Sequence, residues 1–264
     1  MKIRILSLLA VALVAAGAAQ ANGVGPCSAG TVQSVMDQYD CTIGDEIFIF
    51  YNYNVSTSGM HSDDSAGAVG FLPLTDDPLA PGFRLTGPFW SSVAAPPFSE
   101  ASAYVQATLW FSVWTASGDA RITGIGAPAV NGWSLATVPD ASCPSGDCYS
   151  DAQDLIESYL GAPYSYGYFN PYQIQYSGMD PSLIISSAGW PGSPPPTSAS
   201  YGNAYFETWA RSYNYDGSVG GSASASFYSA DFRITESAEP GSWMLLGAAC
   251  VPLLLWGRRA RRAK

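Results

Sequence analysis

Histidine is the scarcest catalytic residue type in this 264-residue chain, which contains a single one, His61. Hydrolysis by a Ser/His/Asp triad requires a histidine as general base, and the sequence has no G-x-S-x-G element that would present a serine on a sharp strand-to-helix turn. His61 also lies in a polar stretch, Met60–Asp64, that is typical of an exposed loop. We therefore interpret His61 as a loop residue and predict that the protein is not an enzyme.

Carboxylates alone could support two further chemistries, glycoside hydrolysis and calcium binding. No pair of carboxylates stands out for hydrolysis among the 21 acidic residues. The acidic positions that could bind calcium lack EF-hand spacing. We interpret them as solvated loops, predict no metal site and keep calcium as the one cofactor left open; they are Asp63, Asp64, Asp76, Asp77, Asp140, Asp147, Asp151 and Asp154.

Two tryptophans have a spacing that suits sugar binding. Trp110 and Trp114 are four positions apart in a run of alternating polar and apolar residues, so both lie on the face opposite the aliphatic one. Aromatic rings at this spacing could stack on successive sugar rings. The alternative is that this face is covered inside a two-sheet sandwich. A carbohydrate-binding module acting on a secreted polysaccharide is therefore the alternative function.

The cysteines indicate disulfides in an oxidising compartment. Of five cysteines, Cys250 lies in an apolar C-terminal run, which leaves Cys27, Cys41, Cys143 and Cys148. Four cysteines allow three pairings. We favour Cys27 with Cys41 and Cys143 with Cys148, because each pair closes a short loop. Zinc is disfavoured by the single histidine and the absence of a second C-x-x-C pair.

The charge of the chain is divided unevenly along its length. The whole chain has 11 basic and 21 acidic residues, a net charge of −10. Between residues 22 and 239 there are four arginines, no lysine and all 21 acidic residues, which gives 4 − 21 = −17. A body this acidic repels nucleic acid and anionic lipid, so we predict no nucleic-acid partner.

Both ends of the chain are typical of targeting signals. Residues 1–21 combine Lys2 and Arg4, a short apolar run and an A-x-A site before Asn22, the pattern of a secretory signal peptide. At the other end, 17 apolar or small residues from Gly241 to Gly257 form a segment at the lower limit for a transmembrane helix. Positive charge after this helix would hold the tail on the cytoplasmic side.

The tail resembles the PEP-CTERM sorting signal of Gram-negative bacteria over residues 238–264. Glu239 and Pro240 match its tripeptide, Ala238 replaces the first proline, and the basic end consists of Arg258, Arg259, Arg261, Arg262 and Lys264. The resemblance implies recognition by an exosortase, a membrane cysteine protease, after transient anchoring in the inner membrane. It also implies export to the cell surface or the exopolysaccharide matrix, with a non-enzymatic structural or surface role.

The body, residues 22–237, has a length that suits a single all-β domain. The stretch Cys41–Asp45 followed by an aromatic strand resembles the N-terminal part of secreted PEP-CTERM proteins, and this resemblance implies a jelly-roll-like β-sandwich. The expected strands are Glu46–Tyr53, Ala103–Thr115, Asn203–Ser212, Ser222–Ile234, and Arg121–Ile125 as the hairpin partner of the second.

Two further expectations concern the finer arrangement. In the first strand we expect Tyr51 and Tyr53 on one face and the phenylalanines on the other. We expect an insertion over residues 139–200. Within it, Asp151–Leu160 is predicted as the one helix, with Ser150 as its N-cap, and residues 161–200 are predicted as loop.

Overall fold

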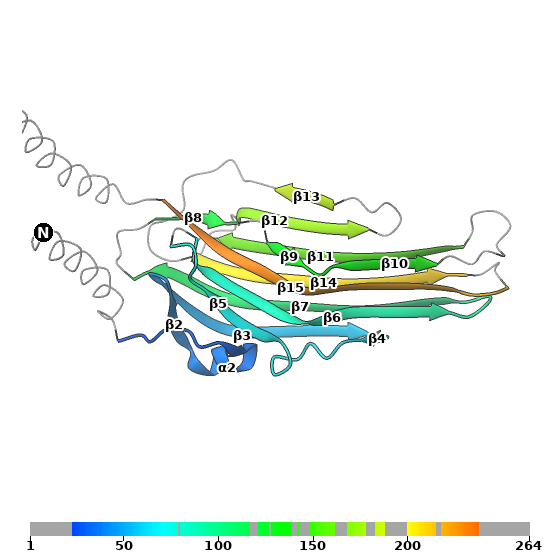
Figure 1. Ribbon diagram of the computed structural model, residues 1–264, viewed down its shortest axis with the longest axis horizontal. Helices are drawn as coiled ribbons and strands as arrows, with labels where there is room; N and C mark the ends of the chain where they lie inside the picture. Colours follow the sequence, from blue (N-terminus) through cyan, green and yellow to red (C-terminus); the bar gives the residue numbers. More distant parts are fainter. Residues whose placement is uncertain are drawn as a thin grey trace, which may run out of the picture.

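The computed structural model describes residues 23–78, 80–116, 121–126, 128–138, 142, 148–161, 168–177, 183–187, 200–214 and 218–237. Within these ranges the chain forms two antiparallel β-sheets that pack face to face, with one short helix at their side (Figure 1). The predicted signal peptide and sorting tail lie outside the described residues. No helix in the described part of the chain has the length and apolar character needed to cross a membrane.

The seven-stranded sheet contains the longest run of neighbouring strands. Its order is β13 (Leu183–Ser187), β12 (Tyr168–Ser177), β11 (Tyr149–Gly161), β14 (Ser200–Tyr213), β7 (Glu100–Thr115), β3 (Glu46–Ser58) and β2 (Asp40–Ile43). The predicted strands at β3, β7 and β14 are confirmed, and each extends beyond the range expected from the sequence.

The eight-stranded sheet is built around β15 (Gly221–Ser237), which also confirms a predicted strand. The main order is β1 (Gly30–Thr31), β5 (Gly70–Leu74), β6 (Gly82–Ala95), β15 and β10 (Ser134–Val138). The short strand β4 (Met60–His61) pairs with β6, and β8 (Arg121–Ile125) and β9 (Ala129–Asn131) pair with β15. The prediction that Arg121–Ile125 forms a hairpin with β7 is therefore wrong, because its backbone hydrogen bonds go to the other sheet.

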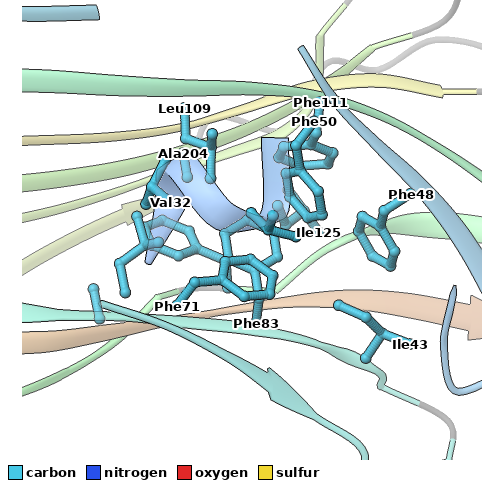
Figure 2. Close-up of a cluster of buried hydrophobic side chains, with 14 of the residues drawn as sticks. Val32, Ile43, Phe48, Phe50, Phe71, Phe83, Leu109, Phe111, Ile125 and Ala204 are labelled. Carbon is cyan, nitrogen blue, oxygen red and sulfur yellow. The ribbon is translucent and has the colours of Figure 1, made fainter. Parts of the chain in front are cut away.

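Aromatic side chains fill one half of the space between the sheets. Phe83 of β6 lies edge to face with Phe50 of β3 and Phe111 of β7, with ring centroids 5.4 Å and 5.5 Å apart (Figure 2). The ring centroid of Phe89 in β6 lies 4.4 Å from that of Phe206 in β14. Burial of each such ring contributes on the order of 2 kcal/mol of stability. This cluster holds the two sheets together.

Alanine dominates the other half of the core. The cluster there consists of Val93, Ala103, Ala152, Ala210, Ala223 and Ala225. Side chains this small let two sheets approach closely while keeping the interior densely packed. The sandwich therefore has an aromatic half and an alanine half.

The segment Asp151–Leu160 is a strand, so the predicted helix is wrong. In β11 every second side chain from Ala152 to Leu160 is buried, and its backbone pairs with β14 on one side and β12 on the other. The apolar residues fit both a helical and an alternating pattern, and pairing with two neighbouring strands decides between them. The predicted loop over 161–200 likewise contributes β12 and β13 to the sheet.

The observed helix is α2 (Val32–Gln38), which the sequence did not predict. Thr31 caps it, and Thr31 and Ser34 exchange side-chain to backbone hydrogen bonds in a capping box. Val32 and Val35 are buried against the aromatic half of the core.

A β-bulge in each sheet redirects the side chains of a long strand. The bulge in β3 falls at Tyr51. In the other sheet the bulge is in β6, where Gly87 and Pro88 lie opposite the single residue Tyr228 of β15. Tyr51 and Tyr228 are 44% and 62% exposed. Beyond the first bulge Tyr53 packs against the core. The prediction that Tyr51 and Tyr53 share one face is wrong because the extra residue reverses the alternation.

The start of the described chain and the end of β15 lie at the same end of the sandwich (Figure 1). The carbonyl of Gly25 accepts a hydrogen bond from Thr42 N–H at 2.9 Å, which places the N-terminal segment beside β2. The predicted disulfide Cys27–Cys41 is present in the same place. Both predicted targeting signals therefore connect to this end of the body.

Candidate functional site

The outer face of the seven-stranded sheet is the strongest candidate for a binding site. In β7 the aliphatic residues from Val105 to Val113 are buried in the core, and the alternate residues, which include Trp110 and Trp114, are half-buried on the outer face. The alternation predicted for this strand is confirmed. Both tryptophans lie on the side of the sheet that faces away from the core.

Three aromatic residues from three strands meet on this face, and we call them the first aromatic cluster. The ring of Trp110 lies 5.4 Å from the ring of Tyr201 at the start of β14, and the Tyr201 ring lies 6.1 Å from that of Tyr51 in β3. The interplanar angles are 38° and 32°. Tyr51 and Tyr201 are 44% and 42% exposed. The cluster therefore presents accessible aromatic surface.

The bulge in β3 is what brings Tyr51 into this cluster. Burial raises the pKa of the Tyr51 phenol above its ordinary value, and hydrogen bonding to Tyr201 raises it further. The phenol consequently stays neutral throughout the physiological range and keeps its O–H as a hydrogen-bond donor.

Trp114 lies on the same face at a distance from the cluster. Trp114 pairs in register with Ile47 of β3. It is four residues from Trp110 along β7, so the two tryptophans are separated by about 13 Å along the strand. The first described pair between β14 and β7 is Ser200 with Val113, so Trp114 lies beyond the described part of β14. The ring neighbour of Trp110 is Tyr201, and Tyr51 in turn neighbours Tyr201; the sequence singled out neither tyrosine as a site residue.

Polar side chains continue the outer face along β7 and β14. The Tyr205 hydroxyl donates a hydrogen bond of 2.6 Å to Glu207 Oε2. Thr108 and Gln106 of β7 lie directly opposite these two residues. Such groups can donate to and accept from sugar hydroxyls.

A second aromatic cluster, Tyr104 with Trp209, lies further along the same two strands. The two residues are directly opposite each other in the register of β7 and β14, which places their Cβ atoms about 5 Å apart on the same face. Next to them, Arg211 forms an ion pair with Glu100 and lies with its guanidinium carbon 5.6 Å from the centre of the Tyr149 ring.

The segment around His61 has hydrogen bonds unlike those of a catalytic triad. His61 Nδ1 lies 2.6 Å from the backbone carbonyl of Ser62, and the Ser62 hydroxyl donates to Asp64 Oδ2 at 2.8 Å and accepts from Trp90 N–H at 2.9 Å. Ser62 is buried. The serine therefore connects the segment after β4 to β6 and is not presented as a nucleophile to substrate. His61 itself ends β4, pairs with Ser91 of β6 and is half-buried, so the prediction that it lies in an exposed loop is wrong.

The acidic residues considered for calcium are dispersed in the described structure. Asp76 accepts hydrogen bonds from Arg233, and Asp154 is completely buried between the sheets. Among the described residues no three histidine, cysteine, aspartate or glutamate side chains are grouped closely enough to hold a metal ion. Asp140 and Asp147 lie outside the described residues.

A layer of buried polar groups separates the two halves of the core. Asp154 of β11 is directly opposite Thr208 of β14, and Ser91 occupies the corresponding position in β6 between Phe89 and Val93. The carboxyl oxygens of Asp154 and the hydroxyls of Thr208 and Ser91 have no hydrogen-bond partner within the described part of the chain. Burial raises the pKa of Asp154 to about 8.

The remaining predicted residues fall partly within the described ranges. Cys148 is disulfide-bonded, and the Cys143 half of its predicted pair lies outside the described residues. The sorting-signal residues also lie outside them: Glu239, Pro240, Arg258, Arg259, Arg261 and Arg262. Comparison of the chain with protein-family models, with curated proteins and with solved structures finds no match.

Proposed function

We propose that this chain is an exported, non-enzymatic protein of the cell envelope or extracellular matrix that contacts exopolysaccharide through the first aromatic cluster. The observation that carries the proposal is the meeting of Tyr51, Trp110 and Tyr201 on the outer face of the seven-stranded sheet. Aromatic rings provide flat apolar surface for the C–H faces of sugars, and neutral phenols add hydrogen bonds.

The fold is suited to such a role. Paired strands of a sandwich hold side chains more rigidly than a loop does, so the cluster is arranged before any ligand arrives. We treat the sandwich as jelly-roll-like, because the connections β6–β7, β10–β11 and β14–β15 each lead from one sheet to the other.

The proposed route to the surface rests on the two predicted signals. Cleavage after residue 21 would release the body on the far side of the inner membrane, and the PEP-CTERM-like tail would hold it there for an exosortase-type protease. The body charge of −17 disfavours binding to anionic lipid, so in this proposal contact with the membrane is limited to the tail.

Binding can be tested with the full-length chain purified in a non-ionic detergent. Retention on exopolysaccharide from the producing cells should fall roughly tenfold in Trp110→Ala and in Tyr201→Ala, since each loses about one stacking contact. Tyr228→Ala is the matched control, because Tyr228 is 62% exposed on the other sheet. Unchanged retention in both cluster variants would rule out the proposed contact.

Sorting can be tested separately by cell fractionation followed by mass spectrometry of the termini. We expect a mature N-terminus at Asn22 and loss of the basic tail from the surface-exposed form. An intact arginine-rich tail on a soluble cytoplasmic protein would contradict export.

A further inference from the structure

The outer face has a second aromatic cluster at a fixed distance from the first. Tyr104 and Trp110 are six residues apart on β7, which corresponds to about 20 Å along the strand. Trp209 of β14 lies beside Tyr104, and Tyr201 of the same strand packs on Trp110. The two clusters are therefore aligned along one pair of neighbouring strands.

The residues between the clusters are polar and point to the same side of the sheet. In β7 these are Gln106 and Thr108, and in β14 they are Tyr205 and Glu207. Their hydroxyl, amide and carboxylate groups offer both donors and acceptors. A chain of sugars lying over this stretch would find stacking surfaces at its two ends and hydrogen-bonding groups in the middle.

The charges on this face indicate what kind of polysaccharide fits. Arg211 is the one basic residue in the described strands of the seven-stranded sheet, and it is paired with Glu100. Glu207 places a carboxylate in the middle of the polar stretch, on a body with a charge of −17. A polyanion such as a uronic-acid polymer would be repelled, whereas an uncharged glycan would not.

We propose that the outer face binds an extended, uncharged polysaccharide chain that lies along β7 and β14 from the first aromatic cluster to the second. This inference rests on the proposed function and adds the direction of the bound chain, its minimum length and its charge. It predicts that a ligand too short to reach both clusters binds more weakly than one that bridges them.

The first test is a panel of neutral polysaccharides and polysaccharides containing uronic acid, applied to the full-length chain. We expect retention on at least one neutral polymer and none on the uronic-acid polymers at low salt. Binding only to uronic-acid polymers, or to no neutral polymer, would overturn the proposal.

The second test uses oligosaccharides of increasing length from the retained neutral polymer. Affinity should rise with length until the oligosaccharide reaches both clusters and then level off. Trp209→Ala should weaken binding of the long oligosaccharides roughly tenfold and leave binding of the disaccharide unchanged. Equal effects on long and short ligands, or no effect on either, would contradict a site that spans the strands.

Two controls separate the possible failures. Trp209→Phe keeps a stacking ring and should restore binding of the long oligosaccharides, and thermal unfolding of each variant identifies loss of fold. If Trp110→Ala and Tyr201→Ala lower retention roughly tenfold while Trp209→Ala leaves it unchanged, the proposed function survives and the extended site is wrong. If none of the three variants changes retention, the proposed function itself is wrong.

Discussion

Asp154 of β11 and Thr208 of β14 lie directly opposite each other between the two sheets, and both side chains are completely buried. Because burial raises the pKa of Asp154 to about 8, its carboxyl group is largely protonated at neutral pH. An unfolded aspartate has a pKa of about 3.9. Between these values the folded protein binds one more proton at Asp154 than the unfolded chain does.

The first prediction concerns pH and stability. With the extra proton on the folded side, the free energy of unfolding falls as pH rises from about 4 to about 8, by up to about 1.4 kcal/mol per pH unit. Asp154→Asn removes this titration, so the variant should gain stability relative to the wild type on going from about pH 5 to about pH 8. Urea denaturation at the two pH values measures the difference.

The control for this experiment is Asp45→Asn, at an exposed position. Asp154 is unchanged in this variant, so the fall in stability between the two pH values should persist. Asp64, whose pKa burial raises to about 6, contributes with the same sign over the lower part of the window, so Asp154→Asn should reduce the slope without abolishing it. An unchanged slope would show that Asp154 is solvated in the folded state.

The second prediction concerns the ion pair between Arg84 of β6 and Asp231 of β15. Arg84 Nε donates a hydrogen bond of 2.5 Å to Asp231 Oδ1, and Arg84 Nη2 donates one of 2.8 Å to Asp231 Oδ2. Asp231 is buried. Arg84→Met would leave a buried carboxylate without its cation and should lower the free energy of unfolding by about 2 kcal/mol. The double variant Arg84→Met/Asp231→Leu should recover part of this loss, as measured by chemical denaturation. A double variant less stable than Arg84→Met would contradict this account.

The third prediction concerns the disulfide Cys27–Cys41, whose cysteines are 14 residues apart in the sequence. Closing a loop of this size restricts the unfolded chain and stabilises the fold by about 3 kcal/mol. Cys27→Ser/Cys41→Ser should therefore lower the midpoint of thermal unfolding by several degrees. Adding a reductant should lower the wild-type midpoint by at least as much, and a wild-type midpoint insensitive to reductant would count against the prediction.

The fourth prediction concerns Ser62, whose hydroxyl bonds both Asp64 and Trp90 N–H. Ser62→Ala leaves a buried acceptor and a buried donor without this partner and should reduce stability by about 2 kcal/mol. Ser102→Ala, at an exposed position on the outer face, is the matched control and should change stability little. Equal effects of the two substitutions would show that the Ser62 hydrogen bonds add nothing to stability.

Strands with a simple alternation could be predicted from the sequence, and strands decided by their neighbours could not. In β7 the inner and outer residues alternate without interruption, so its buried face and its extent from Ala103 to Thr115 were predictable, although the strand begins three residues earlier, at Glu100. In β11 the buried set includes Asp154 and Ser158, polar residues that interrupt the apolar alternation. A helical interpretation then fits the apolar residues equally well, and only the pairing of β11 with β14 and β12 excludes it.

The candidate site was predictable in one residue of three. Trp110 follows from the alternation in β7. Tyr201 lies at the end of a strand whose register against β7 was unknown, and Tyr51 reaches the cluster through a bulge that sequence alternation does not reveal. Predicting that residues of β3, β7 and β14 meet requires the order of the strands in the sheet, and sequence patterns do not give that order.

The C-terminal strand and the aromatic clusters lie on different sheets, which has a mechanical consequence. β15 ends at Ser237 and leads into the predicted sorting tail from the eight-stranded sheet, whereas both aromatic clusters belong to the seven-stranded sheet. Tension between a polysaccharide held on the outer face and a tethered C-terminus would therefore pass through the interior, across contacts such as Phe89 with Phe206. It would shear one sheet against the other, and the interlocking of the side chains between them would set the force that the protein withstands.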